Sequence, residues 1–240
     1  MSRMLGFALL VAALPASAAD VPVPVLVELF TSEGCSSCPP ADAVLARLVR
    51  DQPVRGVEIL GLSEHVDYWD SLGWRDPYSS PVFTQRQEAF ASLSRRGNVY
   101  TPQAVVDGRV DALGTDEGAI RRASSAAASQ PHGTIEARRG AKSLHLDAML
   151  PPHKGADVFV AAVDDPPPSR VERGENAGKT LTHVRVVRDL KRVARFDQPT
   201  WSGDVELDSR LQRLRLVVFV QERTTGRVLA AGTWPPAPGM

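Results

Sequence analysis

The chain has 240 residues, of which 43% are hydrophobic, and its 28 basic and 28 acidic side chains give a formal net charge of zero. This composition is that of a globular protein with a core, so it excludes a disordered or fibrous chain. The neutral balance gives no general electrostatic case for binding nucleic acid or an anionic membrane.

Residues 1–19 have the layout of a secretory signal peptide. Arg3 precedes an apolar run from Leu5 to Leu14, and small residues follow before Asp20. The apolar run is too short to span a bilayer. We therefore expect a secreted protein, periplasmic and free of membrane insertion after cleavage, in a compartment where a disulfide persists.

The next stretch joins a strand, a turn and a helix around the two cysteines. Val25–Phe30 is a run of β-formers, and apolar residues recur at helical spacing after Cys38. A thiol at the start of a helix meets unpaired backbone N–H groups that favour its thiolate. The pattern predicts a redox dithiol in which Cys35 attacks and Cys38 resolves the mixed disulfide. A metal site and an inert structural disulfide are the alternatives.

Further elements complete a predicted α/β domain over residues 20–130. A β-run at 56–62 precedes a long aromatic and charged loop over 63–78, at the sheet edge where open α/β sheets bind ligands. We expect a helix over 81–95, a hairpin with strands at 100–106 and 109–113, and a last helix to Ala128 that Thr115 caps.

Downstream of Ser129–Gly133 the hydrophobic pattern changes to a period of two. Apolar residues alternate with polar ones over 144–150, 158–162 and 214–220, and prolines and glycines mark turns between these runs. Alternation of this kind is typical of antiparallel strands with one buried face. We therefore predict an all-β, sandwich-like domain over residues 131–240.

Two kinds of side chain in the 63–78 loop are candidates for the site. His65 either stabilises the Cys35 thiolate and moves its proton, or is hydrogen-bonded within its own loop to Asp67 or Asp70. Trp69 and Trp74 either form an apolar platform for an extended substrate or pack the loop onto its own domain.

The order of strand, Cys-x-x-Cys helix, strand, helix and a Thr-Pro leading a hairpin resembles a thioredoxin-like fold. The resemblance implies that Pro102 is a cis-proline facing the dithiol. It also implies that the backbone of Thr101 pairs with an extended substrate segment beside Cys35. An ordinary trans proline at the start of a strand is the alternative.

Motifs over nearly all of the mature chain resemble the DUF1223 family of secreted bacterial proteins. The matching stretches are Glu28–Asp42, His65–Asp70, Gly73–Asp76, Tyr100–Gln103 and Arg173–Asn176, with Leu181 and His183. We expect Arg173–Asn176 in a hairpin loop, either as a turn with a surface ion pair or docked against the redox domain.

Two functions from different classes fit these residues. The first is thiol–disulfide exchange with a protein partner, carried by Cys35, Cys38 and Pro102 without a cofactor; the sequence fixes neither its direction nor the oligomeric state. The second is a binding protein, either a module with an inert disulfide or a copper carrier. Related folds in copper-centre assembly suggest Cys35, Cys38 and His65 as copper ligands, although their cysteines are usually spaced one residue wider.

Overall fold

The computed structural model describes residues 21–94, 97–140 and 142–236, so the signal peptide predicted over 1–19 lies outside the described residues. The helices that position the site are α1 (Pro39–Asp51), α2 (Pro81–Leu93) and α3 (Glu117–Ala128). Among the described residues, no helix has both the length and the apolar character needed to cross a membrane.

The centre of the fold is strand β1 (Val23–Thr31), which has a neighbour on each side. It runs parallel to β2 (Val57–His65) and antiparallel to β3 (Gln103–Val106), and β3 forms a hairpin with β4 (Val110–Leu113). Asp107 and Gly108, which lie between the two predicted strands, form the turn that closes this hairpin, with φ angles of 52° and 65°. Positive φ at both turn positions matches the twist of the paired strands.

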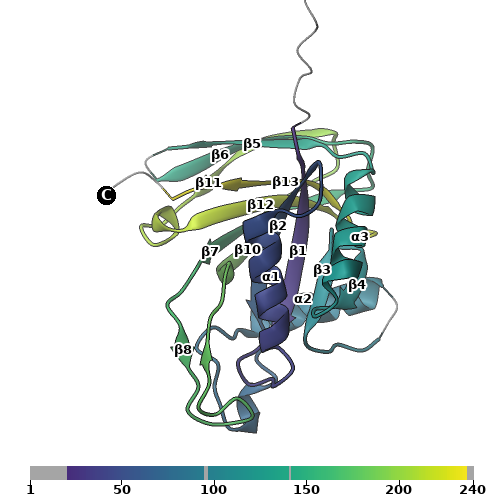
Figure 1. The fold of residues 1–240 in the computed structure, drawn as a ribbon. Helices are drawn as coiled ribbons and strands as arrows, with labels where there is room; N and C mark the ends of the chain where they lie inside the picture. The colour runs from purple at the N-terminus through teal and green to yellow at the C-terminus, as the bar shows by residue number, and fades with distance from the viewer. Residues whose placement is uncertain (1–20, 95–96, 141, 237–240) are drawn as a thin grey trace, which may run out of the picture.

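Helices cover both faces of these strands (Figure 1). Because successive strand side chains point to opposite faces, Val27 packs with α1 and α3, whereas Phe30 packs with Phe90 of α2. Helix α1 also approaches β2 closely at Gly61, where a Cβ would lie 2.6 Å from a methyl carbon of Val49. The sequence therefore fixes α1, and the cysteines at its start, firmly against the sheet.

The sheet continues beyond β2 with strands from the second half of the chain. Strand β10 (Val186–Phe196) runs parallel to β2, with Val186 opposite Ser63. The next strands are β7 (Ala156–Asp164), β12 (Arg215–Glu222) and β13 (Val228–Trp234). One eight-stranded mixed sheet results, in the order β13-β12-β7-β10-β2-β1-β3-β4.

This pairing differs from the separate all-β module that the sequence predicts for residues 131–240. Four strands of that segment extend the sheet that β1 to β4 begin. Hydrophobic alternation indicates which face of a strand is buried, but not which strand lies beside it. The division of the chain into domains near residue 130 stays a prediction.

A second layer of strands covers part of the large sheet. Strands β5 (Thr134–Arg139), β6 (Ser143–Met149) and β11 (Thr200–Glu206) form an antiparallel sheet of three. Leu144 and Leu146 of β6 are fully buried in one core with Val158 of β7 and Val218 of β12. Figure 1 shows this layer lying over β12 and β13. The C-terminal half therefore has the face-to-face packing that its alternating pattern indicates.

Two element boundaries differ from the sequence prediction. Strand β2 continues to His65, so Glu64 and His65 lie on a buried strand rather than in a loop. Helix α3 is capped by Asp116, whose carboxylate accepts a hydrogen bond from Ala119 N at 2.8 Å, and not by Thr115. Both residue types cap helices, so the local sequence left this choice open.

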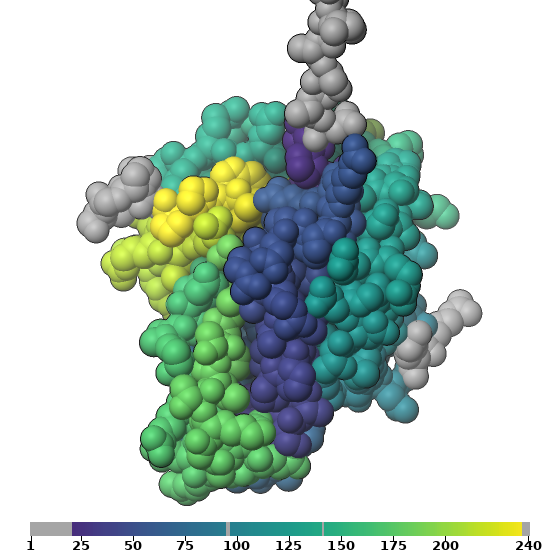
Figure 2. All heavy atoms as spheres, viewed as in Figure 1, coloured from purple at the N-terminus to yellow at the C-terminus, as the bar shows by residue number. Residues whose placement is uncertain are grey.

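A short hairpin brings the C-terminal half to the start of α1. Strand β8 (Ser169–Arg170) pairs with β9 (Thr180–Leu181), and Arg173–Asn176 lies in the loop between them. Figure 2 shows this green segment packed directly beside the blue and purple surface of α1 and the loop that precedes it. Residues from both halves of the chain therefore meet at the cysteines.

Candidate functional site

Cys35 and Cys38 form a disulfide at the start of α1. Cys38 is the residue that precedes the helix, and its carbonyl accepts hydrogen bonds from Ala41 N and Asp42 N. Both cysteines are 0% exposed, whereas the two serines between them are exposed. The disulfide thus lies just beneath the surface, at the N-terminal end of α1, where the helix dipole favours a negative charge.

Two hydroxyl groups contact the sulfur atom of Cys35. The Thr101 hydroxyl donates a hydrogen bond to Cys35 Sγ at 3.4 Å, and Ser37 Oγ lies 3.3 Å from the same sulfur. Thr101 Oγ1 in turn accepts a hydrogen bond from Trp69 Nε1 at 2.9 Å. The Thr101–Pro102 bond is cis, as the resemblance implied. The structure therefore brings Thr101 and Trp69 together at Cys35.

The loop between β8 and β9 contacts the backbone of the cysteine loop, which is residues 32–38 between β1 and α1. Asn176 is fully buried, and its Nδ2 donates hydrogen bonds to the carbonyl oxygens of Glu33 and Cys35, each at 2.9 Å. The Glu175 carboxylate accepts a hydrogen bond from Ser36 N at 3.0 Å. Of the two alternatives for Arg173–Asn176, docking against the cysteine loop is the one that these contacts confirm.

His65 forms a buried pair with a carboxylate of the following loop. Its Nδ1 lies 2.7 Å from Asp76 Oδ2, and both side chains are fully buried. A hydrogen bond within the loop was one alternative, but the predicted partners Asp67 and Asp70 were wrong. Those two carboxylates accept hydrogen bonds from hydroxyl groups elsewhere in the loop and on α2.

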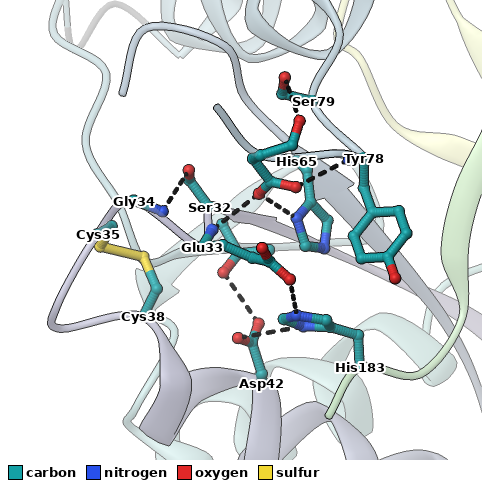
Figure 3. A network of polar contacts seen from close by, with 12 residues as sticks. Ser32, Glu33, Gly34, Cys35, Cys38, Asp42, His65, Tyr78, Ser79 and His183 are labelled. Atoms are coloured by element: carbon teal, nitrogen blue, oxygen red, sulfur yellow. Dashed lines mark hydrogen bonds and ion pairs between the residues drawn. A yellow bond between two sulfur atoms is a disulfide. The ribbon is translucent and has the colours of Figure 1, made fainter. Parts of the chain in front are cut away.

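Glu33 connects the cysteine loop to a second buried histidine (Figure 3). Its Oε1 lies 3.1 Å from His183 Nε2, and its backbone N–H donates to Asp76 Oδ2 at 2.7 Å. His183 Nδ1 lies 3.6 Å from Asp42 Oδ2, and Asp42 also accepts a hydrogen bond from Thr31 Oγ1. These contacts form a continuous polar network behind the disulfide.

The loop aromatics turn their polar atoms inward. Trp74 Nε1 donates to Glu33 Oε2 at 2.8 Å, and Tyr68 OH donates to Gln87 Oε1 at 3.2 Å. Trp69 likewise reaches Thr101, so all three rings anchor the loop to the rest of the molecule. These contacts favour the packing alternative, while a role of Trp69 and Trp74 in substrate binding stays a prediction.

Burial and charge shift two pKa values in the network in opposite directions. Burial acts to lower the pKa of His183, but its contacts with Asp42 and Glu33 outweigh burial and raise that pKa to about 9. Burial acts to raise the pKa of Asp76, but His65 and the N–H groups of Glu33 and Tyr78 bring it below its usual range. Near neutral pH, His183 is therefore a buried cation beside carboxylates.

The three candidate copper ligands, Cys35, Cys38 and His65, do not form a metal-binding cluster. Figure 3 shows Ser32 and Glu33 lying between the His65 ring and the two bonded sulfurs. Within residues 21–236, apart from the three positions left out, no group of three or more His, Cys, Asp or Glu side chains is arranged to hold a metal ion. The copper-carrier alternative therefore gains no support from the geometry.

A separate charged cluster lies on the α2 face of the sheet. Arg86 forms ion pairs with Glu28 and, at 3.6 Å, with Glu64 Oε1. The Arg86 guanidinium also lies over the rings of Phe159 and Phe219, at 5.1 and 5.0 Å from their centres. Burial, together with the nearby Glu28 carboxylate, raises the pKa of Glu64 well above its usual value. One arginine therefore lies beside two buried carboxyl groups, and burial favours the protonated form of Glu64.

Sequence reasoning missed the network that Glu33, Asp42, Asp76 and His183 form. In the sequence, these four residues stand out only as members of the stretches that resemble the DUF1223 family. The signal present in the sequence was that His183 and Arg173–Asn176 belong to the motifs of the DUF1223 resemblance. Nothing in the local pattern shows that residues so far apart in the chain meet.

The fold and the site together define a mixed α/β protein with a buried Cys-x-x-Cys disulfide at a helix start. The chain belongs to the family described as "Protein of unknown function (DUF1223)", whose model matches residues 26–221. It is also similar to a crystal structure of an Agrobacterium tumefaciens protein determined as a structural genomics target. That similarity has a TM-score of 0.77 at 26% identity and covers 91% of this chain and 97% of the other. No curated protein matches the chain.

Proposed function

We propose that the protein is a secreted, periplasmic thiol–disulfide oxidoreductase with a thioredoxin-like N-terminal part. The observation that carries the proposal is the Cys35–Cys38 disulfide at the start of α1. The strand order β2-β1-β3-β4, in which α1 connects a parallel pair, supports the thioredoxin-like arrangement. The hydrogen bond from the Thr101 hydroxyl to Cys35 Sγ supports thiol–disulfide exchange, because such a bond favours the thiolate.

Exchange proceeds in two steps that balance in atoms and electrons. A partner thiolate attacks Cys35 Sγ, the bond between the two sulfurs breaks, and Cys38 leaves as a thiolate. A second thiol of the partner then attacks the partner sulfur of the mixed disulfide, and Cys35 leaves. The partner gains a disulfide and loses two electrons to the cysteine pair, while its thiol protons pass to the cysteines or to water. The reverse sequence oxidises the protein.

A binding protein with an inert disulfide is the second candidate, and one specific observation favours it. Both cysteines are 0% exposed, so an attacking thiolate reaches Cys35 Sγ only when covering groups move. Reactive cysteines are usually partly exposed, whereas fully buried ones are inert. The two candidates therefore differ in how readily the folded protein exchanges its disulfide.

Equilibration of the mature protein with glutathione buffers separates the two candidates. We expect the cysteine pair to equilibrate within the range of known oxidoreductases, and its position in that range gives the direction of electron flow. The Cys35→Ser variant should lose exchange, and reduced Cys38→Ser should accumulate mixed disulfides with a model disulfide peptide, because only Cys35 attacks. A pair that stays oxidised under strongly reducing buffers while the protein remains folded would establish the inert disulfide instead.

A further inference from the structure

Three buried carboxylates surround the cysteine loop. Glu33 lies two residues before Cys35, and Asp42 lies one helical turn after Cys38. Asp76 accepts the backbone N–H of Glu33. Glu33, Asp42 and Asp76 are 0%, 6% and 2% exposed, so water and salt screen their charges only weakly.

Such carboxylates act on only one redox state of the cysteine pair. The disulfide is neutral, whereas the reduced pair carries a negative charge whenever one cysteine is a thiolate. Nearby carboxylates raise the free energy of a thiolate and leave that of the disulfide unchanged. Without compensation, they shift the equilibrium toward the oxidised form.

One residue from the C-terminal half compensates two of these carboxylates directly. His183 Nε2 lies 3.1 Å from Glu33 Oε1, and its Nδ1 lies 3.6 Å from Asp42 Oδ2. Its side chain is 1% exposed, and Figure 3 shows its ring spanning the space between the two carboxylates. A cation held there offsets their field at the sulfurs.

We propose that His183 is a positioning residue that stabilises the reduced Cys35–Cys38 pair by neutralising Glu33 and Asp42. The proposal rests on the thiol–disulfide exchange argued above and adds a control that the C-terminal half exerts on it. The reaction is reduction of the disulfide by two glutathione thiols, which become glutathione disulfide. His183 makes and breaks no bond in this reaction.

The charged and titratable groups around His183 determine its protonation. The groups that face it are Glu33 after β1, Asp42 on α1, His65 on β2 and Tyr78 before α2. Behind them, Asp76 pairs with His65, and the guanidinium of Arg188 on β10 lies 4.5 Å from the centre of the Tyr78 ring. The contacts with Asp42 and Glu33 prevail over burial and give His183 a pKa of about 9, so it is a cation through neutral pH.

The test compares two variants that change the charge in opposite directions. His183→Gln keeps a donor for Glu33 but removes the cation, and Asp42→Asn keeps an acceptor for Thr31 but removes an anion. The control is His145→Gln, because His145 lies on β6 of the three-stranded sheet. Each protein is equilibrated with glutathione buffers from pH 6 to 10, and the reduced fraction is measured after alkylation by mass spectrometry.

At pH 7 we expect the equilibrium constant for reduction to fall about tenfold in His183→Gln and to rise in Asp42→Asn. Tenfold is the order expected for one charge acting over a distance on the order of 10 Å in a protein interior. His145→Gln should match the wild type. The gap between His183→Gln and the wild type should close near pH 10, because the wild-type histidine is then neutral as well.

Two results would overturn the proposal while leaving the exchange function intact. One is a His183→Gln equilibrium constant within twofold of the wild type at pH 7. The other is a gap that persists unchanged at pH 10, which would indicate a packing role. If His183→Gln does not fold, an Asp42→Asn constant that fails to rise overturns the proposal. A wild-type protein that never equilibrates with glutathione overturns both the exchange function and this control of it.

Discussion

At the scale of single residues, the Thr101 hydroxyl is the contact that bears most directly on the reactivity of Cys35. It donates a hydrogen bond to Cys35 Sγ, a contact of the kind that favours a thiolate once the disulfide is reduced, and the same oxygen accepts from Trp69 Nε1. Valine has nearly the shape of threonine but lacks this donor. The consequence therefore appears in chemistry at the sulfur more than in packing.

We predict that Thr101→Val slows alkylation of the reduced protein by iodoacetamide at pH 6 about tenfold, the effect of one lost hydrogen bond to a charged group. Thr101→Ser, which retains the hydroxyl, should react nearly as fast as the wild type. Rates are measured by mass spectrometry on protein reduced beforehand. Equal rates for the valine and serine variants would show that the hydroxyl does not act on the thiolate.

Glu64 gives a prediction about stability rather than reactivity. Its pKa is raised by burial and by Glu28, so the folded protein holds a proton that the unfolded chain releases above its ordinary pKa of 4.5. Wild-type stability therefore falls as the pH rises above this value.

We predict that Glu64→Gln gains stability relative to the wild type between pH 5 and 8, by up to about 1.4 kcal/mol per pH unit. Glutamine keeps the shape and needs no proton. Urea unfolding at several pH values measures the difference, with the half-buried Glu58→Gln on the same strand as the control. A constant difference across this range would mean that Glu64 is charged in the folded protein.

At the scale of elements, the loop between β8 and β9 holds the cysteine loop in place through hydrogen bonds to its backbone. A single side chain, Asn176, donates hydrogen bonds to the carbonyl groups of Glu33 and Cys35, and the Cys35 carbonyl also accepts one from Cys38 N. Buried carbonyl groups left without a donor destabilise the folded state.

We predict that Asn176→Ala lowers the free energy of unfolding by about 1–3 kcal/mol and speeds reduction of the disulfide by dithiothreitol. The loosened loop should expose Cys35 more often. Lys179→Ala is the matched control, since the exposed Lys179 side chain donates to the Asn176 amide oxygen and its loss leaves the Asn176 Nδ2 bonds to both carbonyl groups in place. If Asn176→Ala is reduced at the wild-type rate, the loop does not govern access to the sulfur.

Local elements are also where the sequence was most informative. The Asp107–Gly108 turn, the helix after Cys38 and the alternating strands 144–150 and 158–162 all follow from patterns within a few residues. The helix cap at Asp116 and the extension of β2 to His65 did not, because neighbouring residues offered equally good choices. Of the site, the cysteine pair and the Thr-Pro were predicted, and the buried network was not.

At the scale of the whole molecule, the network that sequence reasoning missed depends on contacts between distant parts of the chain. Glu33 and His183 are separated by 150 positions, yet their side chains touch because β10 pairs with β2. A periodic pattern contains no information on which distant strands pair, and the residues brought together have no common local signature.

The same pair makes global stability depend on pH in the alkaline range. The folded pKa of His183 is raised from 6.5 to about 9, so its contribution is fully present below pH 6.5 and is lost as the pH rises through 9. We predict a loss on the order of 3 kcal/mol over this window in the wild type. His183→Gln should lack this loss when both proteins are unfolded with urea from pH 6 to 10. Parallel curves for the two proteins would contradict the prediction.

Because both halves of the chain share one sheet, cutting the chain between them would leave a strand edge unpaired. A fragment that ends near residue 130 keeps β1 to β4 and the cysteines, but it leaves the edge of β2 at Ser63 without β10. It also loses Asn176, whose side chain donates to the carbonyl groups of Glu33 and Cys35 in the cysteine loop. An open strand edge is a template for pairing with other chains. Such a fragment should associate with itself, and adding residues 131–236 as a separate polypeptide should reverse that association.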